Sequence, residues 1–163
     1  MSDEPELRIE PARESDTPVL LRMIKALVDY EQLAHEFTVT ESTLRQALFG
    51  PRPAAEAVLG YVGRELVGFA VYFPTFSTAS GHIGLFLEDL YVEPEWRGRG
   101  IGRKLFIHVA QVAAKRGGGG LSWSVLGWND PAIGFYQSLG AEQLRDSLSF
   151  RLMGTGLDRL VGR

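Results

Sequence analysis

The sequence predicts an α/β fold built on a mixed β-sheet, and three observations support this fold class. Short β-prone runs alternate with segments of helical periodicity along 163 residues. A strand, a glycine-rich loop and an amphipathic helix follow one another directly over residues 86–116. Apolar residues make up 45% of the chain, which is ample for one hydrophobic core. We therefore expect a single domain spanning residues 1–163.

Two helices are expected before the first hairpin, after a short strand at residues 7–10. Asp16 and Pro18 are typical of a helix start. The helix after them presents one apolar face, formed by Leu20, Ile24, Leu27 and Val28. Thr40 is a typical N-cap for a shorter second helix, which should end at the Gly-Pro pair at 50–51.

The middle of the chain predicts three strands. Residues 57–62 and 66–73 are β-prone and flank Gly63-Arg64-Glu65, a sequence typical of a hairpin turn. Small and polar residues dominate 75–81, so we expect a loop there. The next strand should occupy residues 85–92.

The helix after the glycine-rich loop is predicted from its own sequence. Apolar residues recur at three- and four-residue steps, at Ile101, Leu105, Val109 and Val112. Lys115 and Arg116 lie in the last predicted turn, where cations suit the negative end of a helix. Gly117 is expected to end it.

The C-terminal part is predicted to contain strands around one more helix. The four glycines at 117–120 form a flexible connector, and residues 121–126 read as a strand. A short helix should begin at Pro131 and end near residues 139–140. Residues 144–153 fit a terminal pair of strands.

Composition excludes several classes of function. The chain has no cysteine, so thiol nucleophiles, disulfides and thiolate metal sites are unavailable. Its three histidines are far apart in sequence, and we expect no metal. A formal net charge of −3 gives no reason to expect nucleic-acid binding. Without a signal peptide or a long apolar run, we expect a cytoplasmic protein with no membrane contact.

The glycine-rich loop predicts an anion site. Several backbone N–H groups and a helix N-terminus point at one place there. The spacing does not match a dinucleotide-binding loop, because Arg103 replaces the third glycine counted from Gly98. It does not match a Walker A loop either, since no Gly-Lys-Ser/Thr ends it. A plain strand-to-helix turn is the alternative interpretation.

Two blocks of sequence resemble the GNAT family of N-acetyltransferases. The first is the strand with Leu-Glu-Asp at 87–89, followed by Arg97-x-x-Gly100-x-Gly102. The second runs from Trp128-Asn129 to Leu-Gly-Ala at 139–141 and includes Phe-Tyr at 135–136. Together they resemble the diamine (spermidine/spermine) and thialysine acetyltransferase branch. The resemblance implies six to seven strands with splayed middle strands, about four helices, acetyl-CoA as co-substrate and a homodimer.

The resemblance also implies a cofactor-binding set. The main chain of one strand would pair with the pantetheine arm, and the loop and first helical turn would hold the diphosphate. A second helix start would add contacts, although Asn129 could instead form an ordinary turn before Pro131. The implied residues are Leu90, Tyr91, Val92, Arg97, Gly98, Arg99, Gly100, Ile101, Gly102, Arg103, Asn129, Asp130 and Ala132.

Glu88 and Tyr136 are the predicted catalytic residues. An alkylammonium has a pKa near 10.4, so a base is needed to release the amine at neutral pH. Glu88 matches the glutamate proposed for this role in the family, and the alternative is that it only attracts the cation. Tyr136 would protonate the departing thiolate; alternatively it packs against the sheet, a duty for which Phe135 is better suited.

Acidic and aromatic residues are predicted to bind the acceptor. Tyr30 and Glu31 match a pair that contacts polyamine in the family, with an exposed helix end as the alternative. Glu88 and Asp89 would add negative charge; in a regular strand these neighbours would face opposite sides. Polyamines, thialysine and lysine-like amines all fit, and antibiotic amines and protein N-termini remain open.

We therefore expect an acetyl-CoA-dependent N-acetyltransferase acting on the primary amine of a small molecule. A catalytically silent acyl-CoA sensor on the same fold is the alternative. The presence of both Glu88 and Tyr136 favours the enzyme. Nucleotide-phosphate binding without acyl transfer is disfavoured by the two spacings that fail.

Overall fold

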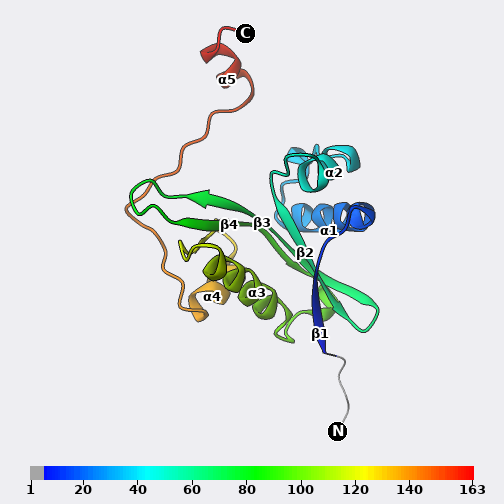
Figure 1. Cartoon of the computed structure of the whole chain (residues 1–163). Coiled ribbons are helices and arrows are strands. Elements are labelled where there is room, and N and C mark those ends of the chain that lie inside the picture. The colour runs from blue at the N-terminus through cyan, green and yellow to red at the C-terminus, as the bar shows by residue number, and fades with distance from the viewer. Residues whose placement is uncertain (1–5) are drawn as a thin grey trace. The chain divides into compact units, whose positions relative to one another are not determined.

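The computed structural model describes residues 6–163 (Figure 1). The chain forms two compact units. The first unit ends at Ser124, and the second comprises Val125–Arg163. Each unit is described by itself.

The first unit contains a five-stranded mixed sheet in the order β1-β2-β3-β4-β5. Strands β1 to β4 pair with one another in antiparallel fashion, whereas β5 pairs with β4 in parallel. This confirms the predicted sheet class and the hairpin at Gly63. The strands are β1 (Leu7–Pro11), β2 (Glu56–Val62), β3 (Glu65–Phe76), β4 (Ile83–Val92) and β5 (Leu121–Ser122).

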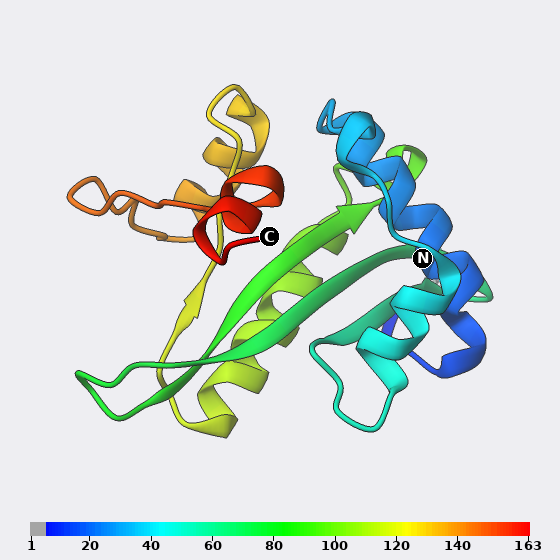
Figure 2. The ribbon, with the colours of Figure 1, turned by 90° about the horizontal axis from the view of Figure 1, so that it is seen from above.

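Helices cover both faces of this sheet, as Figures 1 and 2 show. Helix α3 (Ile101–Arg116) packs on one face, and α1 (Thr17–Tyr30) and α2 (Glu41–Phe49) lie on the other. Leu105 and Val109 of α3 are fully buried in the first core, and Leu20 and Met23 of α1 are fully buried in the second. The predicted helical periodicities are thus confirmed by burial.

Local sequence explains where these helices begin and end. The Thr40 hydroxyl accepts a hydrogen bond from the backbone N–H of Thr43 at 3.1 Å, which caps α2 as predicted. Pro18 occupies the first turn of α1, and Gly117 follows the last residue of α3. Three short 3₁₀ helices connect the larger elements, at Glu14–Asp16, Ala34–Glu36 and Pro94–Trp96.

The second unit consists of two helices joined by an extended segment. The helices are α4 (Asp130–Ser138) and α5 (Gly154–Leu160). The predicted start of α4 at Pro131 is confirmed to within one residue, whereas α5 was not predicted.

The prediction of two strands at 144–153 is wrong. Apolar and polar residues alternate from Leu148 to Leu152 as in a strand, but a strand needs a neighbour for its backbone. Within the described chain, the N–H groups of residues 142–150 have no backbone acceptor. Phe150 is 91% exposed. Residues 144–153 therefore have strand-like sequence without strand pairing.

The numbers of elements also differ from expectation. Residues 6–163 contain five strands and five α-helices, against six to seven strands and four helices. The predicted strand at 121–126 is shortened to its first two residues, because it pairs with β4 only at Leu85–Leu121 and Phe86–Ser122. Along the described residues, no helix has both the length and the apolar character needed to span a bilayer.

Candidate active site

The β4 strand is irregular at Glu88. Asp89 lies opposite Val71 in β3, and Leu87 lies opposite Tyr72, so Glu88 has no partner in the ladder. Such an extra residue is a β-bulge, which bends the strand and redirects its side chains. The bulge therefore falls on the residue predicted to be the catalytic base.

The bulge changes which residues of β4 face each core. Before it, Leu85 and Leu87 pack on the α3 side; after it, Leu90 and Val92 pack there. Tyr91 packs in the core on the α1 side. Asp89, two residues before Tyr91, falls on the same side of the strand. The expected alternation from Glu88 to Asp89 applied to a regular strand, and the bulge interrupts the pleat at this point.

Three carboxylates from α1 and β4 share one electrostatic environment. Burial raises the pKa of Asp89 to about 7, and the charges of Glu88 and Glu31 add to this rise. Burial, followed by the charge of Glu88, also raises the pKa of Glu31. Clustered acids favour protonation of one another and attract a cation strongly. The structure thus brings together three of the four predicted acceptor-binding residues.

The end of α1 places Tyr30 and Glu31. Gln32, the next residue, has φ of 61° and is the single non-glycine residue among 6–163 with a positive φ. Its N–H donates to Asp29 O at 3.1 Å, and the N–H of Leu33 donates to Val28 O at 3.0 Å. These two bonds form a Schellman motif, which normally uses glycine at the position of Gln32.

The loop after β4 adopts a conformation that requires glycine. Gly98 has φ of 77° and Gly100 has φ of 76°, in the left-handed region. A Cβ at either position would meet no atom within 4 Å. Backbone conformation, not space within this chain, is therefore the reason for these two glycines.

Backbone N–H groups gather where this loop becomes α3. In the described part of the chain, the N–H groups of residues 98–103 have no backbone acceptor. The first helical bond of α3 runs from Lys104 N–H to Gly100 O, at 3.1 Å. A run of unsatisfied donors at the positive end of a 16-residue helix is suited to a diphosphate.

The β4 strand also offers an open edge next to this loop. One side pairs with β3 along nearly its whole length, but β5 pairs with only Leu85 and Phe86. Among the strands of the described chain, residues 87–92 therefore have no neighbour on the β5 side. Leu90, Tyr91 and Val92 lie in this stretch, where an amide-bearing ligand could add by backbone hydrogen bonding.

The two loop arginines have different surroundings. The Arg99 guanidinium carbon lies 4.6 Å from the centroid of the Trp96 ring. The Arg97 guanidinium carbon lies 5.2 Å from the Tyr30 ring centroid and 5.5 Å from that of Tyr91. Ile101 is buried against the sheet, whereas Gly102 and Arg103 lie on the more accessible side of α3. The sequence did not indicate the contact between Arg97 and Tyr30.

The second unit carries the remaining predicted residues around the start and middle of α4. Asn129 is buried, and its side-chain oxygen accepts from the N–H of Ala132 at 3.3 Å. The Asn129 side chain therefore caps α4, which is a local structural role of the kind expected if Asn129 does not bind the cofactor. Asp130 is the first residue of the helix. Tyr136 is half-buried, with its ring centroid 5.0 Å from that of Phe135.

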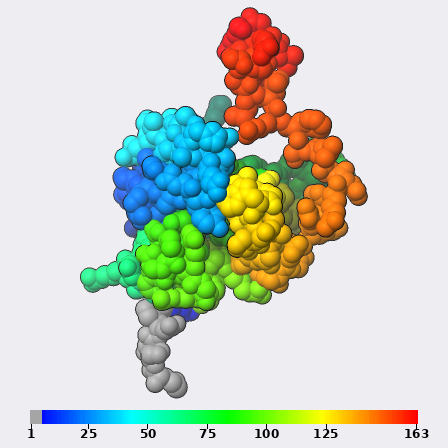
Figure 3. All heavy atoms as spheres, turned by 180° about the vertical axis from the view of Figure 1, so that it is seen from behind, coloured from blue at the N-terminus to red at the C-terminus, as the bar shows by residue number. Residues whose placement is uncertain are grey.

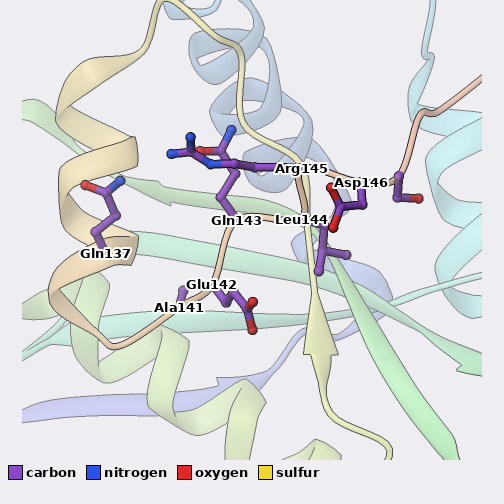
Figure 4. A pocket seen from close by; sticks show the side chains of 8 residues that line it. Gln137, Ala141, Glu142, Gln143, Leu144, Arg145 and Asp146 are labelled. Atoms are coloured by element: carbon purple, nitrogen blue, oxygen red, sulfur yellow. The ribbon is translucent and has the colours of Figure 1, made fainter.

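A hollow in the second unit lies beside the C-terminal end of α4. Figure 4 shows the side chains around it, lined by Gln137, Ala141, Glu142, Gln143, Leu144, Arg145, Asp146 and Ser147. None of the predicted catalytic or cofactor-binding residues lines this hollow. Within residues 6–163, no three histidine, aspartate or glutamate side chains are arranged so that they could hold a metal ion.

Sequence reasoning missed two features that position these residues. The bulge at Glu88 had no clear signal, because residues 85–87 and 90–92 are all apolar and the sequence shows no alternation there. The left-handed Gln32 had none, since glutamine is not a residue that marks such a turn.

Comparisons with known proteins agree with this geometry. Residues 24–141 match the Acetyltransferase (GNAT) family. The chain is 38% identical to the thialysine N-epsilon-acetyltransferase of Mus musculus, covering 96% of this chain and 98% of that protein. It is 27% identical to an L-ornithine N5-acetyltransferase of Arabidopsis thaliana, over 94% and 87% of the two chains.

A solved structure gives the same result for the fold. The integron cassette protein from the mobile metagenome of V. cholerae superimposes with a TM-score of 0.81 and 25% identity. The superposition covers 96% of this chain and 98% of that one. With the bulged strand, the glycine loop and the full-length similarity in place, the chain belongs to the acetyltransferase (GNAT) family.

Proposed function

We propose that this N-acetyltransferase acts on the side-chain amine of a small, lysine-like molecule, with thialysine, lysine and ornithine as the leading candidates. One observation carries the proposal. Glu31, directly after α1, and Glu88 and Asp89 of β4 influence one another electrostatically, and together they would attract an ammonium group. The relatives named for thialysine and ornithine support the same class of acceptor.

Acetyl-CoA is the proposed co-substrate, and the residues present fit it. The unsatisfied N–H groups of residues 98–103 suit the diphosphate, with Arg99 and Arg103 adding positive charge. The open edge of β4 at residues 90–92 suits the amides of the pantetheine arm, although Val92 O already accepts a hydrogen bond from Arg97 Nε at 2.8 Å. Asn129, Asp130 and Ala132 would contribute further contacts from the start of α4.

Glu88 is the proposed base and Tyr136 the proposed acid. Glu88 accepts a proton from the ammonium, directly or through water, so that the amine nitrogen carries a lone pair. That nitrogen bonds to the thioester carbon, whose oxygen is polarised by a backbone N–H of β4. The C–S bond then breaks, and the Tyr136 hydroxyl protonates the leaving thiolate, which has a reference pKa near 8.5. The nitrogen loses its surplus proton to the Tyr136 oxygen, which leaves a neutral amide and restores the hydroxyl.

The two units are proposed to form one catalytic domain that works as a homodimer. The family match over residues 24–141 crosses the boundary at Ser124, which supports a single functional domain. Apolar side chains exposed in the second unit support a subunit interface, with Leu148 at 79% exposure. Light scattering at several protein concentrations measures the oligomeric state.

The acceptor proposal is tested by thiol release from acetyl-CoA with a panel of amines. Thialysine, lysine and ornithine should give the highest kcat/KM, and lysine already acetylated on its side-chain nitrogen should give none. Spermidine and spermine serve as the competing class. A kcat/KM for spermine tenfold above every amino acid would reject a lysine-like acceptor.

Proton release provides a second readout of the same site. A bound ammonium favours the ionised form of nearby carboxylates, so it should lower the pKa of Asp89 from about 7. Calorimetry of amine binding at pH 7 in buffers of different ionisation enthalpy measures this proton. The silent-sensor alternative predicts acetyl-CoA binding without turnover of any amine, and no observation on this chain favours it.

A further inference from the structure

The Arg97 side chain is held by three groups of the first unit. Its Nε donates a hydrogen bond to Val92 O at 2.8 Å. Its guanidinium lies between the rings of Tyr30 and Tyr91, at 5.2 and 5.5 Å from their centroids. Both distances fall within the range of cation–π attraction. Arg97 therefore joins the end of β4 to the end of α1.

A second set of contacts, formed by hydrogen bonds, joins the end of β4 to α1 nearby. The Tyr91 hydroxyl donates to Glu93 Oε2 at 3.2 Å, and Glu93 Oε1 accepts from Arg22 of α1 at 3.1 Å. Figure 3 shows the segment that follows β4, in light green, against the blue side chains of α1. The segment before the glycine loop is thus attached to α1 at two places along the helix.

The attachment at Tyr30 acts directly on the acceptor site. Glu31 follows Tyr30 in the chain, and its carboxylate lies in the field of Glu88. The turn after Glu31 is closed by the left-handed Gln32. Movement of the Tyr30 ring would therefore shift Glu31 relative to the bulge of β4.

We propose that Arg97 is a positioning residue for the acceptor site, holding Tyr30 and hence Glu31 against β4, and that its guanidinium does not bind the diphosphate. This inference rests on the proposed function, since it assigns Arg97 to the acceptor half of that site. The sequence led us to expect that Arg97 contributes to cofactor binding, and the proposal changes this expectation for the Arg97 side chain alone. The backbone donors at 98–103 remain assigned to the diphosphate.

The test compares two acetyl donors. Arg97→Met keeps a long, unbranched side chain without the charge. S-acetylpantetheine carries the same thioester as acetyl-CoA but lacks the diphosphate and nucleotide. The amine KM of Arg97→Met should rise about two- to fivefold, by the same factor with both donors, as expected for an exposed cation–π pair. The Kd for acetyl-CoA should change less than twofold.

Arg103→Met in the first turn of α3 is the matched comparator. It should weaken acetyl-CoA binding and leave the kinetics with S-acetylpantetheine nearly unchanged. If Arg97→Met shows this pattern instead, with its defect disappearing for the truncated donor, Arg97 binds phosphate and the proposal is wrong. Arg97→Lys keeps a cation near the rings and should restore part of the amine KM.

A double-mutant cycle with Tyr30→Leu tests the route of the effect. In the Tyr30→Leu background, Arg97→Met should raise the amine KM by less than twofold, because the partner ring is already absent. Additive effects would overturn the proposal. If the wild type turns over no amine, the proposed function fails, but the acetyl-CoA Kd and the coupling in thermal unfolding still decide the role of Arg97.

Discussion

The charge of Glu88 in the bulge of β4 raises the pKa of Glu31 at the end of α1, in addition to the effect of burial. The two residues come from different elements of the fold, Glu31 from the end of α1 and Glu88 from β4. Burial, together with the charges of Glu88 and Glu31, raises the pKa of the neighbouring Asp89 to about 7. This arrangement suits the capture of a cation and makes Glu88 and Asp89 the most informative positions for mutagenesis.

Glu88→Gln should lower turnover most at low pH. If Glu88 removes the ammonium proton, its loss matters less as pH rises towards the amine pKa near 10.4, because free amine becomes abundant. We expect a drop in kcat of about 10²-fold at pH 7 and a much smaller drop at pH 9.5. The kcat profile from pH 6.5 to 10 measures this. A defect of equal size throughout would show that Glu88 only positions the amine.

Tyr136→Phe should depress turnover much more than cofactor affinity. The substitution removes the hydroxyl but keeps the ring that packs on Phe135 at 5.0 Å. Without the acid, the thiolate must leave unprotonated, so we expect a loss of about 10²-fold or more in kcat. Calorimetry should give an acetyl-CoA Kd within threefold of wild type. Phe135→Leu is the packing control; unchanged kcat in Tyr136→Phe would remove the acid role.

Asp89→Asn should stabilise the fold as pH rises. In the unfolded chain Asp89 ionises near pH 4, but in the folded protein its pKa is about 7. Between these values the folded state binds the extra proton, so the wild-type free energy of unfolding falls as pH rises through this window. With asparagine at position 89, this decrease in the free energy of unfolding with rising pH is absent. We expect the variant to be more stable by about 1–3 kcal/mol at pH 8, allowing for partial exposure.

Thermal unfolding at pH 4.5, 6 and 8 measures the effect of Asp89→Asn. The difference in free energy from wild type should be smallest at pH 4.5, larger at pH 6 and largest at pH 8. Asp158→Asn on the exposed surface of α5 is the control. A constant difference at all three pH values would show that Asp89 does not titrate in this range.

Gln32→Gly should raise the free energy of unfolding by about 0.5–1 kcal/mol, because glycine adopts the left-handed conformation without the Cβ penalty. The φ of 61° at Gln32 and the two bonds of the Schellman motif define this position. Gln46→Gly, in the middle of α2, is the opposite control and should destabilise by a similar amount. Chemical denaturation curves compare the three proteins. Destabilisation by Gln32→Gly would mean that the side chain supports the turn.

The sequence by itself determined the glycine loop, the helix after it and the class of chemistry. Arg97-x-x-Gly100-x-Gly102 and the apolar period from Ile101 to Val112 are local patterns, and the structure confirms the helix at 101–116. Thr40 and the Gly63 turn were likewise predictable, because caps and turns depend on nearby residues. The match to the acetyltransferase family agrees with the resemblance carried by these motifs.

Only the tertiary structure decided how distant residues meet. The electrostatic effect of Glu88 on Glu31, and the contacts of Arg97 with the rings of Tyr30 and Tyr91, depend on how α1 packs on β4. No local pattern encodes such contacts, because they are set by burial of whole helix faces against the sheet. The same reason explains why the two strands predicted at 144–153 are not formed. Alternation of apolar and polar residues gives a strand one face that can pack on a core, but its backbone needs a neighbouring strand that the local sequence does not specify.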